Sequence, residues 1–214
     1  MIKLEKINRA ETLRYLGNSS ASVDGRMTAL LDKCEGELLG ALNIKYLYKI
    51  LPAKDCPIIV GESARAHLEG CDRVCAVCLT LGAEVDKLIR QASVRDMAEA
   101  VALDAMASSA VESALCELDE VIAAESLGSF LTWRFSPGYG DYPLELQQEL
   151  LTLLDAQRKI GLCADDSSVL TPTKSVTAIM GLSETPLEKR RQGCAVCNMK
   201  EKCKFRKAGT RCEF

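Results

Sequence analysis

The stretch RVCAVCLTL, residues 73–81, decides the fold class, because it is apolar almost throughout. A continuous apolar run of this length predicts a strand that is buried on both faces of a sheet. Further strands are predicted for residues 42–51, which alternate apolar and polar side chains and end at Pro52, and for residues 58–60, 129–134 and 175–180. The chain therefore contains a sheet that includes this apolar run.

Helices separate these strands irregularly. Apolar residues at helical spacing predict a helix over residues 23–38, with Ser20 or Ser22 as its N-cap and Asp24 in its first turn. Other helices are predicted over 62–70, around 85–89, and over 94–125, 144–154 and 155–160. The 94–125 helix is rich in Ala, and its predicted buried stripe is Met97, Val101, Val111, Leu115, Leu118 and Ile122. The pattern predicts a single α+β domain with a largely antiparallel or mixed sheet packed by helices, including the long Ala-rich helix, plus a small Cys-rich tail.

The composition is that of a soluble globular protein, with 48% hydrophobic and 27% charged residues. No apolar run approaches the roughly 18 residues that span a bilayer, and the opening MIKLEKINRA lacks the apolar core of a secretory signal. We therefore expect a cytoplasmic protein. Disulfides are not expected there, so the eleven cysteines should be small buried hydrophobes or metal ligands.

Charge divides the chain into two parts. Residues 186–214 carry nine Lys or Arg against three acidic residues, whereas residues 1–185 carry eighteen against twenty-seven. A net charge of +6 beside one of −9 marks the basic segment as a separate functional unit. The predicted organisation is a ligand-binding domain over residues 1–185 and a basic, Cys-rich, metal-binding tail over residues 186–214.

The segment WRFSPGYGDYP, residues 133–143, predicts a binding bend where an apolar run ends. Arg134 offers a planar, permanently charged fork suited to a carboxylate, and the glycines let backbone N–H groups approach a ligand closely. Asp141 could accept a hydrogen bond from an amine or a ribose hydroxyl. The residue types alone favour the alternative, a surface loop whose Arg forms an ion pair.

Arg134, Ser136, Pro137, Gly138, Tyr139 and Pro143 form the pattern R-x-S-P-G-Y-x-x-x-P. This pattern resembles the S-adenosylmethionine-binding motif of the activation domain of cobalamin-dependent methionine synthase. The segment PTKSVTAIMG, residues 172–181, is similar to the family's later P-x-x-S-V-S/T segment, and KIG at residues 159–161 fits the layout. The resemblance covers roughly residues 10–185, with specific motifs in the last third.

The resemblance implies a role for each matched residue. Arg134 would hold the methionine carboxylate of S-adenosylmethionine, and backbone groups at Ser136 and Gly138 would line the ligand. Tyr139 would shape the pocket near the transferred methyl group, which gives it the catalytic role. Asp141 and Ser175 would complete the ligand contacts. The chain departs from the family at residues 140–142, where Gly-Asp-Tyr replaces a stretch that tends to contain Cys and His.

The function implied by the resemblance is reductive methylation. Cobalamin occasionally oxidises to inert cob(II)alamin during turnover, and one-electron reduction coupled to methyl transfer from S-adenosylmethionine restores methylcobalamin. This sequence contains no methyltransferase or cobalamin-binding module, so it would act in trans on a separate methionine synthase or related corrinoid protein. Alone it would bind S-adenosylmethionine and turn nothing over.

A radical S-adenosylmethionine enzyme is the main alternative function. Cys71, Cys75 and Cys78 follow the C-x3-C-x2-C spacing of the iron–sulfur signature in that class. The strand prediction argues against a cluster, because an odd separation points Cys75 and Cys78 to opposite faces. Cys34, Cys116 and Cys163 are interpreted as packing residues, and His67, the only histidine, as a surface or capping residue.

The tail contains Cys194, Cys197, Cys203 and Cys212 with C-x2-C-x5-C-x8-C spacing, which suits zinc or a four-thiolate iron–sulfur cluster. The segment has too few apolar residues to fold unaided, so bound metal would supply folding energy. Its basic residues could dock an acidic partner such as a flavodoxin or ferredoxin. A nucleic-acid-binding module is a further alternative, which the acidic body disfavours.

Overall fold

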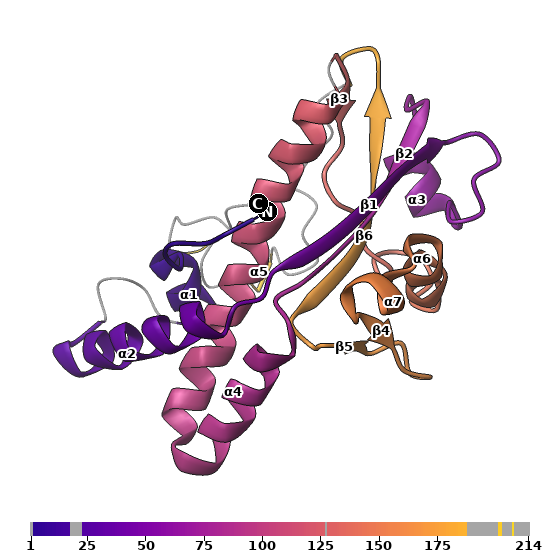
Figure 1. Ribbon diagram of the computed structural model, residues 1–214. Helices are drawn as coiled ribbons and strands as arrows, with labels where there is room; N and C mark the ends of the chain where they lie inside the picture. The colour runs from indigo at the N-terminus through magenta and orange to yellow at the C-terminus, as the bar shows by residue number, and fades with distance from the viewer. Residues whose placement is uncertain (1, 18–22, 127, 188–200, 203–206, 208–214) are drawn as a thin grey trace.

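The computed structural model describes residues 2–17, 23–126, 128–187, 201–202 and 207, and it has helices on both faces of an antiparallel sheet (Figure 1). The sheet has four strands. Their order is β1 (Lys45–Pro52), β2 (Arg73–Thr80), β6 (Ser175–Ser183) and β3 (Phe130–Leu131), and each pair is antiparallel. This arrangement confirms the predicted α+β class with a largely antiparallel sheet.

Strand β2 separates two hydrophobic cores. Cys75, Val77 and Leu79 face the core on one side of the sheet, whereas Val74, Ala76 and Cys78 face the core on the other. Seven consecutive residues of this strand are buried, because successive side chains alternate between two covered faces. The apolar run at residues 73–81 was therefore predicted correctly.

Each face of the sheet carries its own group of helices (Figure 1). One face is covered by α1 (Arg9–Tyr15), α2 (Gly25–Ala41), α4 (Ala83–Arg95) and α5 (Met97–Glu125). The other is covered by α3 (Glu62–His67), α6 (Leu146–Leu154) and α7 (Ala156–Ile160), beside a second sheet formed by β4 (Cys163–Ala164) and β5 (Leu170–Thr171). No helix of these described residues is long and apolar enough to cross a membrane.

The long helix α5 begins later than predicted. Asp96 caps it, since the carboxylate accepts a hydrogen bond from Ala98 N at 2.8 Å, and this break separates α5 from α4. The predicted stripe is correct for its last four residues but wrong at Met97 and Val101, which are 64% and 51% exposed. In these first turns the buried apolar residues are Ala100, Ala102 and Leu103, so a different face of the helix is covered.

Three local predictions are also corrected. The N-cap of α2 is Asp24, whose side chain accepts a hydrogen bond from Met27 N at 2.8 Å, whereas Ser20 and Ser22 lie outside the described residues. Residues 58–60 form no strand; Ile58 is instead a buried loop residue of the α3–α6 core. Cys34 is buried as predicted, but Cys116 is exposed on α5 and Cys163 is only half-buried.

Candidate functional site

The predicted bend leaves the sheet at Phe135. After β3 the chain continues beside β6: Thr132 N donates to Gly181 O at 2.9 Å, and Phe135 exchanges two hydrogen bonds of 2.9 Å with Ile179. A tight turn follows, closed by a hydrogen bond of 2.8 Å from Gly138 N to Tyr142 O. The bend is therefore fixed at one end by the sheet and at the other by its own backbone.

Helix α3 supports the far side of the bend. Both carboxylate oxygens of Asp141 accept hydrogen bonds from the first amides of α3, at 2.7 Å from Glu62 N and 2.8 Å from Ser63 N. Gly140 has φ +58°, and a Cβ there would lie 2.9 Å from Ser63 Cβ. Only glycine combines that backbone conformation with so close an approach. Asp141 thus holds the bend against α3.

These hydrogen bonds, with Ser63 as the main cause, lower the pKa of Asp141 from 3.8 to about 2. A lowered native pKa stabilises the fold above the unfolded pKa, and this stabilisation is lost as the pH falls toward 2. We expect Asp141→Asn to be less stable than the wild type at pH 5, with the difference shrinking by pH 2.5. Urea unfolding at both pH values measures this, and an equal difference at both would contradict the role of the carboxylate.

Arg134 points to the opposite face of the bend, toward α5. Its guanidinium forms ion pairs with Asp119 and, at 3.3 Å, with Glu112 of that helix. The Arg134 side chain is 16% exposed and the two acidic side chains are 30% and 34% exposed, so the cluster lies partly sheltered at the surface. One cation beside two carboxylates gives this cluster an excess of negative charge.

The surroundings of Asp119 perturb its carboxyl group. Burial raises its pKa, which the positive charge of Arg134 partly offsets and the negative charge of Glu112 reinforces. Its Oδ2 pairs with Arg134, whereas Oδ1 is buried without a hydrogen-bond partner among the described residues. Arg134 therefore orients this carboxylate and favours its charged form.

A hollow of about 280 Å³ opens between the end of α1 and helix α5. It is lined by Tyr15, Leu16, Ala100, Val101, Asp104, Ala105 and Ser108. Glu112 lies one helical turn beyond Ser108 on the same face of α5. Burial raises the pKa of Tyr15, and the negative charge of Glu112 raises it further, so this phenol lies within electrostatic reach of the acid. The hollow is thus close to the Arg134 cluster.

The start of β6 lies beside this hollow as well. Lys174 Nζ donates to Ser108 Oγ at 3.0 Å and pairs with Asp104 at 2.8 Å. The next residue, Ser175, donates from its hydroxyl to Pro172 O at 2.6 Å. The backbone N–H and C=O of Ile179 bond to Phe135, on the edge of β6 that faces away from β2. Because these groups alternate between the two edges along an antiparallel strand, those of Thr177 and Ser175 face the same edge. At Ser175 and Thr177 this edge has no strand partner among the described residues, whereas β3 and Phe135 pair with it further along.

Tyr139 is an exposed residue of the predicted site. Its side chain is 64% exposed, and its ring centroid lies 6.1 Å from that of Phe135. Ser136 is half-buried beside it, and Gly138 has φ +91°. The structure therefore brings Arg134, Ser136 and Tyr139 together on one bend, with Ser175 further along the adjoining β6 edge and Asp141 turned toward α3.

Cys71, Cys75 and Cys78 are not arranged as cluster ligands. Cys75 and Cys78 are fully buried in opposite cores, and burial raises the pKa of each thiol to about 12. No group of three or more metal-binding side chains occurs in the part of the chain that the structure describes. The predicted metal ligands Cys194, Cys197, Cys203 and Cys212 lie outside that part.

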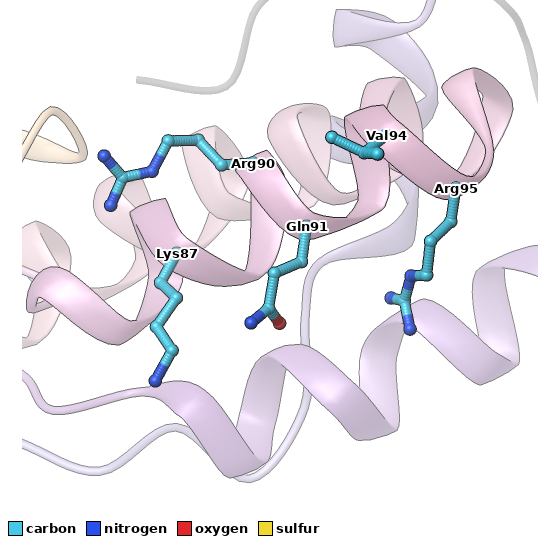
Figure 2. A pocket seen from close by; sticks show the side chains of 5 residues that line it. All are labelled: Lys87, Arg90, Gln91, Val94 and Arg95. Atoms are coloured by element: carbon cyan, nitrogen blue, oxygen red, sulfur yellow. The ribbon is translucent and has the colours of Figure 1, made fainter.

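A larger hollow of about 590 Å³ lies on α4, away from the bend. Figure 2 shows its lining along one helix, with Lys87, Gln91 and Arg95 extending to one side and Arg90 to the other. Val94 lies among them and is 88% exposed. This basic, open groove shares no residue with the predicted site.

Sequence reasoning missed Glu112, Asp119 and Tyr15. The two acids are seven residues apart on α5, so they lie on one face of the helix, two turns apart. Their seven-residue spacing is a weak signal, because the Ala-rich α5 carries five other acidic residues. Their pairing with Arg134 depends on how the bend crosses α5, which helical spacing alone does not fix.

No family model and no curated protein matches the chain. Among solved structures, it is similar to a crystal structure of the MetH reactivation domain bound to AdoHcy, with a TM-score of 0.60 and 15% sequence identity. The likeness covers 86% of this chain and 76% of that chain. Similarity at this level of identity establishes a shared fold.

Proposed function

We propose that the chain binds S-adenosylmethionine between α5 and the bend and presents its methyl group to reduced cobalamin on a separate methionine synthase or corrinoid protein. The observation that carries the proposal is the Arg134–Glu112–Asp119 cluster beside a bend with the R-x-S-P-G-Y pattern. The shared fold supports it, because the similar structure contains AdoHcy, the demethylated form of the same ligand.

The charges of the cluster complement those of the ligand. S-adenosylmethionine carries a carboxylate, an ammonium group and a sulfonium, so its net charge is positive. Arg134 has five N–H donors and uses two of them on Asp119 and Glu112, which leaves donors for the ligand carboxylate. Glu112 is the more loosely held acid, at 3.3 Å, and would pair with the ligand ammonium. Asp119 would keep the guanidinium in place.

The bend would supply the remaining contacts. Backbone groups at Ser136 and Gly138 would line the ligand, and the exposed ring of Tyr139 would shape the space around the methyl group. Ser175 would contribute from the unpaired edge of β6. Both oxygens of Asp141 accept hydrogen bonds from the backbone of α3. We therefore assign Asp141 to holding the bend in place, and its effect on the ligand would be indirect.

The chemistry would be completed by two other molecules. An electron donor, such as a flavodoxin or ferredoxin, would supply one electron to the cobalamin of the partner protein. The methyl group would then pass from the ligand held by this chain to that cobalamin, the carbon–sulfur bond would break with its electron pair remaining on sulfur, and S-adenosylhomocysteine would leave. The residues of this chain bind and orient the methyl donor, and they leave the methyl group accessible to the partner.

We also propose that Cys194, Cys197, Cys203 and Cys212 bind zinc or a four-iron cluster. Four thiolates with this spacing in a basic segment support that assignment. A cluster would provide a route for the electron, whereas zinc would make the tail a docking element. Metal analysis of protein purified without air distinguishes the two, and a metal-free tail would contradict both.

Calorimetric titration with S-adenosylmethionine tests the proposed binding. We expect the wild type to bind and Glu112→Gln to bind about tenfold more weakly, because one charge-assisted contact to the ammonium is lost. Glu120→Gln is the matched control, since Glu120 lies exposed on the same helix. Absence of binding by the wild type, or equal weakening by both variants, would contradict the proposal.

A further inference from the structure

We propose that His67, at the end of α3, is the positioning residue that fixes Arg134 for the ligand. This inference rests on the proposed function and extends it to a residue that does not line the proposed binding surface. His67 was predicted to lie at the surface or to cap a helix, but its side chain is only 4% exposed. It is buried because α3 packs directly against the chain segment that carries Arg134.

The imidazole holds the main chain on the N-terminal side of Arg134. Its Nε2 lies 2.9 Å from Trp133 O and 2.9 Å from Thr132 Oγ1. A carbonyl oxygen can only accept, so Nε2 carries the proton and donates it to Trp133 O. Thr132 Oγ1 in turn accepts a hydrogen bond of 2.8 Å from Gly181 N, which connects this contact to β6.

The same ring also holds the C-terminal side. It stacks on Phe135, with centroids 4.9 Å apart and an interplanar angle of 19°, and it meets Trp133 edge to face at 4.6 Å. Trp133 and Phe135 are the two neighbours of Arg134 in the chain. One buried side chain therefore fixes the backbone before and after the guanidinium-bearing residue.

Helix α3 is thereby connected to both arms of the bend. Its first amides bind Asp141 after the turn, and His67 in its last turn binds the segment before the turn. A helix of only six residues is a short and rigid connection between these points. Arg134 lies between them and extends to α5, so the position of its guanidinium depends on this connection.

Glutamine and asparagine in place of His67 differ only in the length of the side chain. Glutamine carries an amide nitrogen as far from Cβ as Nε2 of the imidazole, so His67→Gln can still donate to Trp133 O. Asparagine is one methylene shorter and cannot reach that oxygen. His67→Phe keeps the stacking on Phe135 but has no donor. These variants separate the hydrogen bond from the packing of the ring.

Calorimetric titration with S-adenosylmethionine measures the effect of each variant. We expect His67→Phe and His67→Asn to bind about tenfold more weakly than the wild type, because a displaced Arg134 loses its alignment with the carboxylate. His67→Gln should bind within about threefold of the wild type. If His67→Phe does not fold, the Gln and Asn variants decide the question alone.

A double-mutant cycle distinguishes positioning from a general effect on folding. If His67 acts through Arg134, then His67→Asn should weaken binding far less in an Arg134→Lys background than in the wild type. Equal weakening in both backgrounds, or wild-type affinity of His67→Asn, would overturn the inference and leave the proposed function intact. A wild type that binds no S-adenosylmethionine would instead overturn the proposed function, and the inference with it.

Discussion

Replacing Arg134 by methionine is expected to weaken the binding of S-adenosylmethionine by about 100-fold or more, because both charge-assisted contacts to the ligand carboxylate are lost. The same change should lower the free energy of unfolding by about 1–3 kcal/mol. Glu112 and Asp119 would then face each other without a cation, and Asp119 already has a raised pKa from burial. The partial exposure of both acids keeps this cost below that of a fully buried ion pair.

The two effects of this substitution can be separated. Adding Asp119→Asn to Arg134→Met removes one of the unpaired charges, so stability should recover in part while ligand binding stays lost. Arg158→Met is the control, since Arg158 is 78% exposed on α7 and pairs with Asp155 at the start of its own helix. Thermal unfolding and calorimetry measure both quantities. Wild-type affinity of the Arg134→Met protein would contradict the assigned role.

Replacing Tyr142 by alanine should lower the free energy of unfolding by about 3–5 kcal/mol, the largest stability effect that we expect in the bend. The Tyr142 side chain is 1% exposed, it stacks on Phe135 with centroids 5.7 Å apart, and its hydroxyl donates to Ile58 O at 3.0 Å. Alanine would leave a cavity between the bend and α6, and the bend would lose its buried anchor.

Tyr142→Phe isolates the hydroxyl group. It keeps the ring and should cost only about 1 kcal/mol, the usual net value of one hydrogen bond. Tyr139→Ala is the matched surface control, because Tyr139 is 64% exposed and should change stability by less than about 0.5 kcal/mol. Urea unfolding at neutral pH compares the three variants. Equal stability of Tyr142→Ala and Tyr139→Ala would show that Tyr142 does not anchor the bend.

The sheet could be predicted where burial leaves a strong pattern. Residues 73–81 are apolar on both faces because both faces of β2 are covered, and no other environment tolerates such a run in a strand. Residues 58–60 are equally apolar, yet Ile58 is buried as a loop residue. Three apolar residues fill a core as readily from a loop as from a strand, so short runs do not specify an element.

The helices show a similar limit. The stripe of α5 was predicted correctly at its last four residues and wrongly at Met97 and Val101, because Ala100 and Leu103 are buried in those turns instead. An Ala-rich helix offers more than one apolar face, and helical periodicity does not indicate which of them is covered. The exposed Cys116 reflects the same limit, because its neighbours along the helix are buried on another face.

Only the part of the candidate site that is contiguous in the sequence could be predicted. The bend is one short segment whose Gly, Pro and Arg content is visible in the sequence. Glu112, Asp119 and His67 reach the bend from helices that are distant along the chain, and their partners depend on tertiary packing. Asp141 was expected to contact a ligand. Its two oxygens instead accept hydrogen bonds from the first amides of α3, which need acceptors because they have none within the helix.

A crystal structure of the protein with S-adenosylmethionine locates the ligand. We expect it between α5 and the bend, with its carboxylate on the Arg134 guanidinium, its ammonium near Glu112 and its methyl group exposed beside Tyr139. A ligand bound elsewhere, such as in the basic groove on α4, with Arg134 still enclosed by its two acids, would show that the bend is not the binding site.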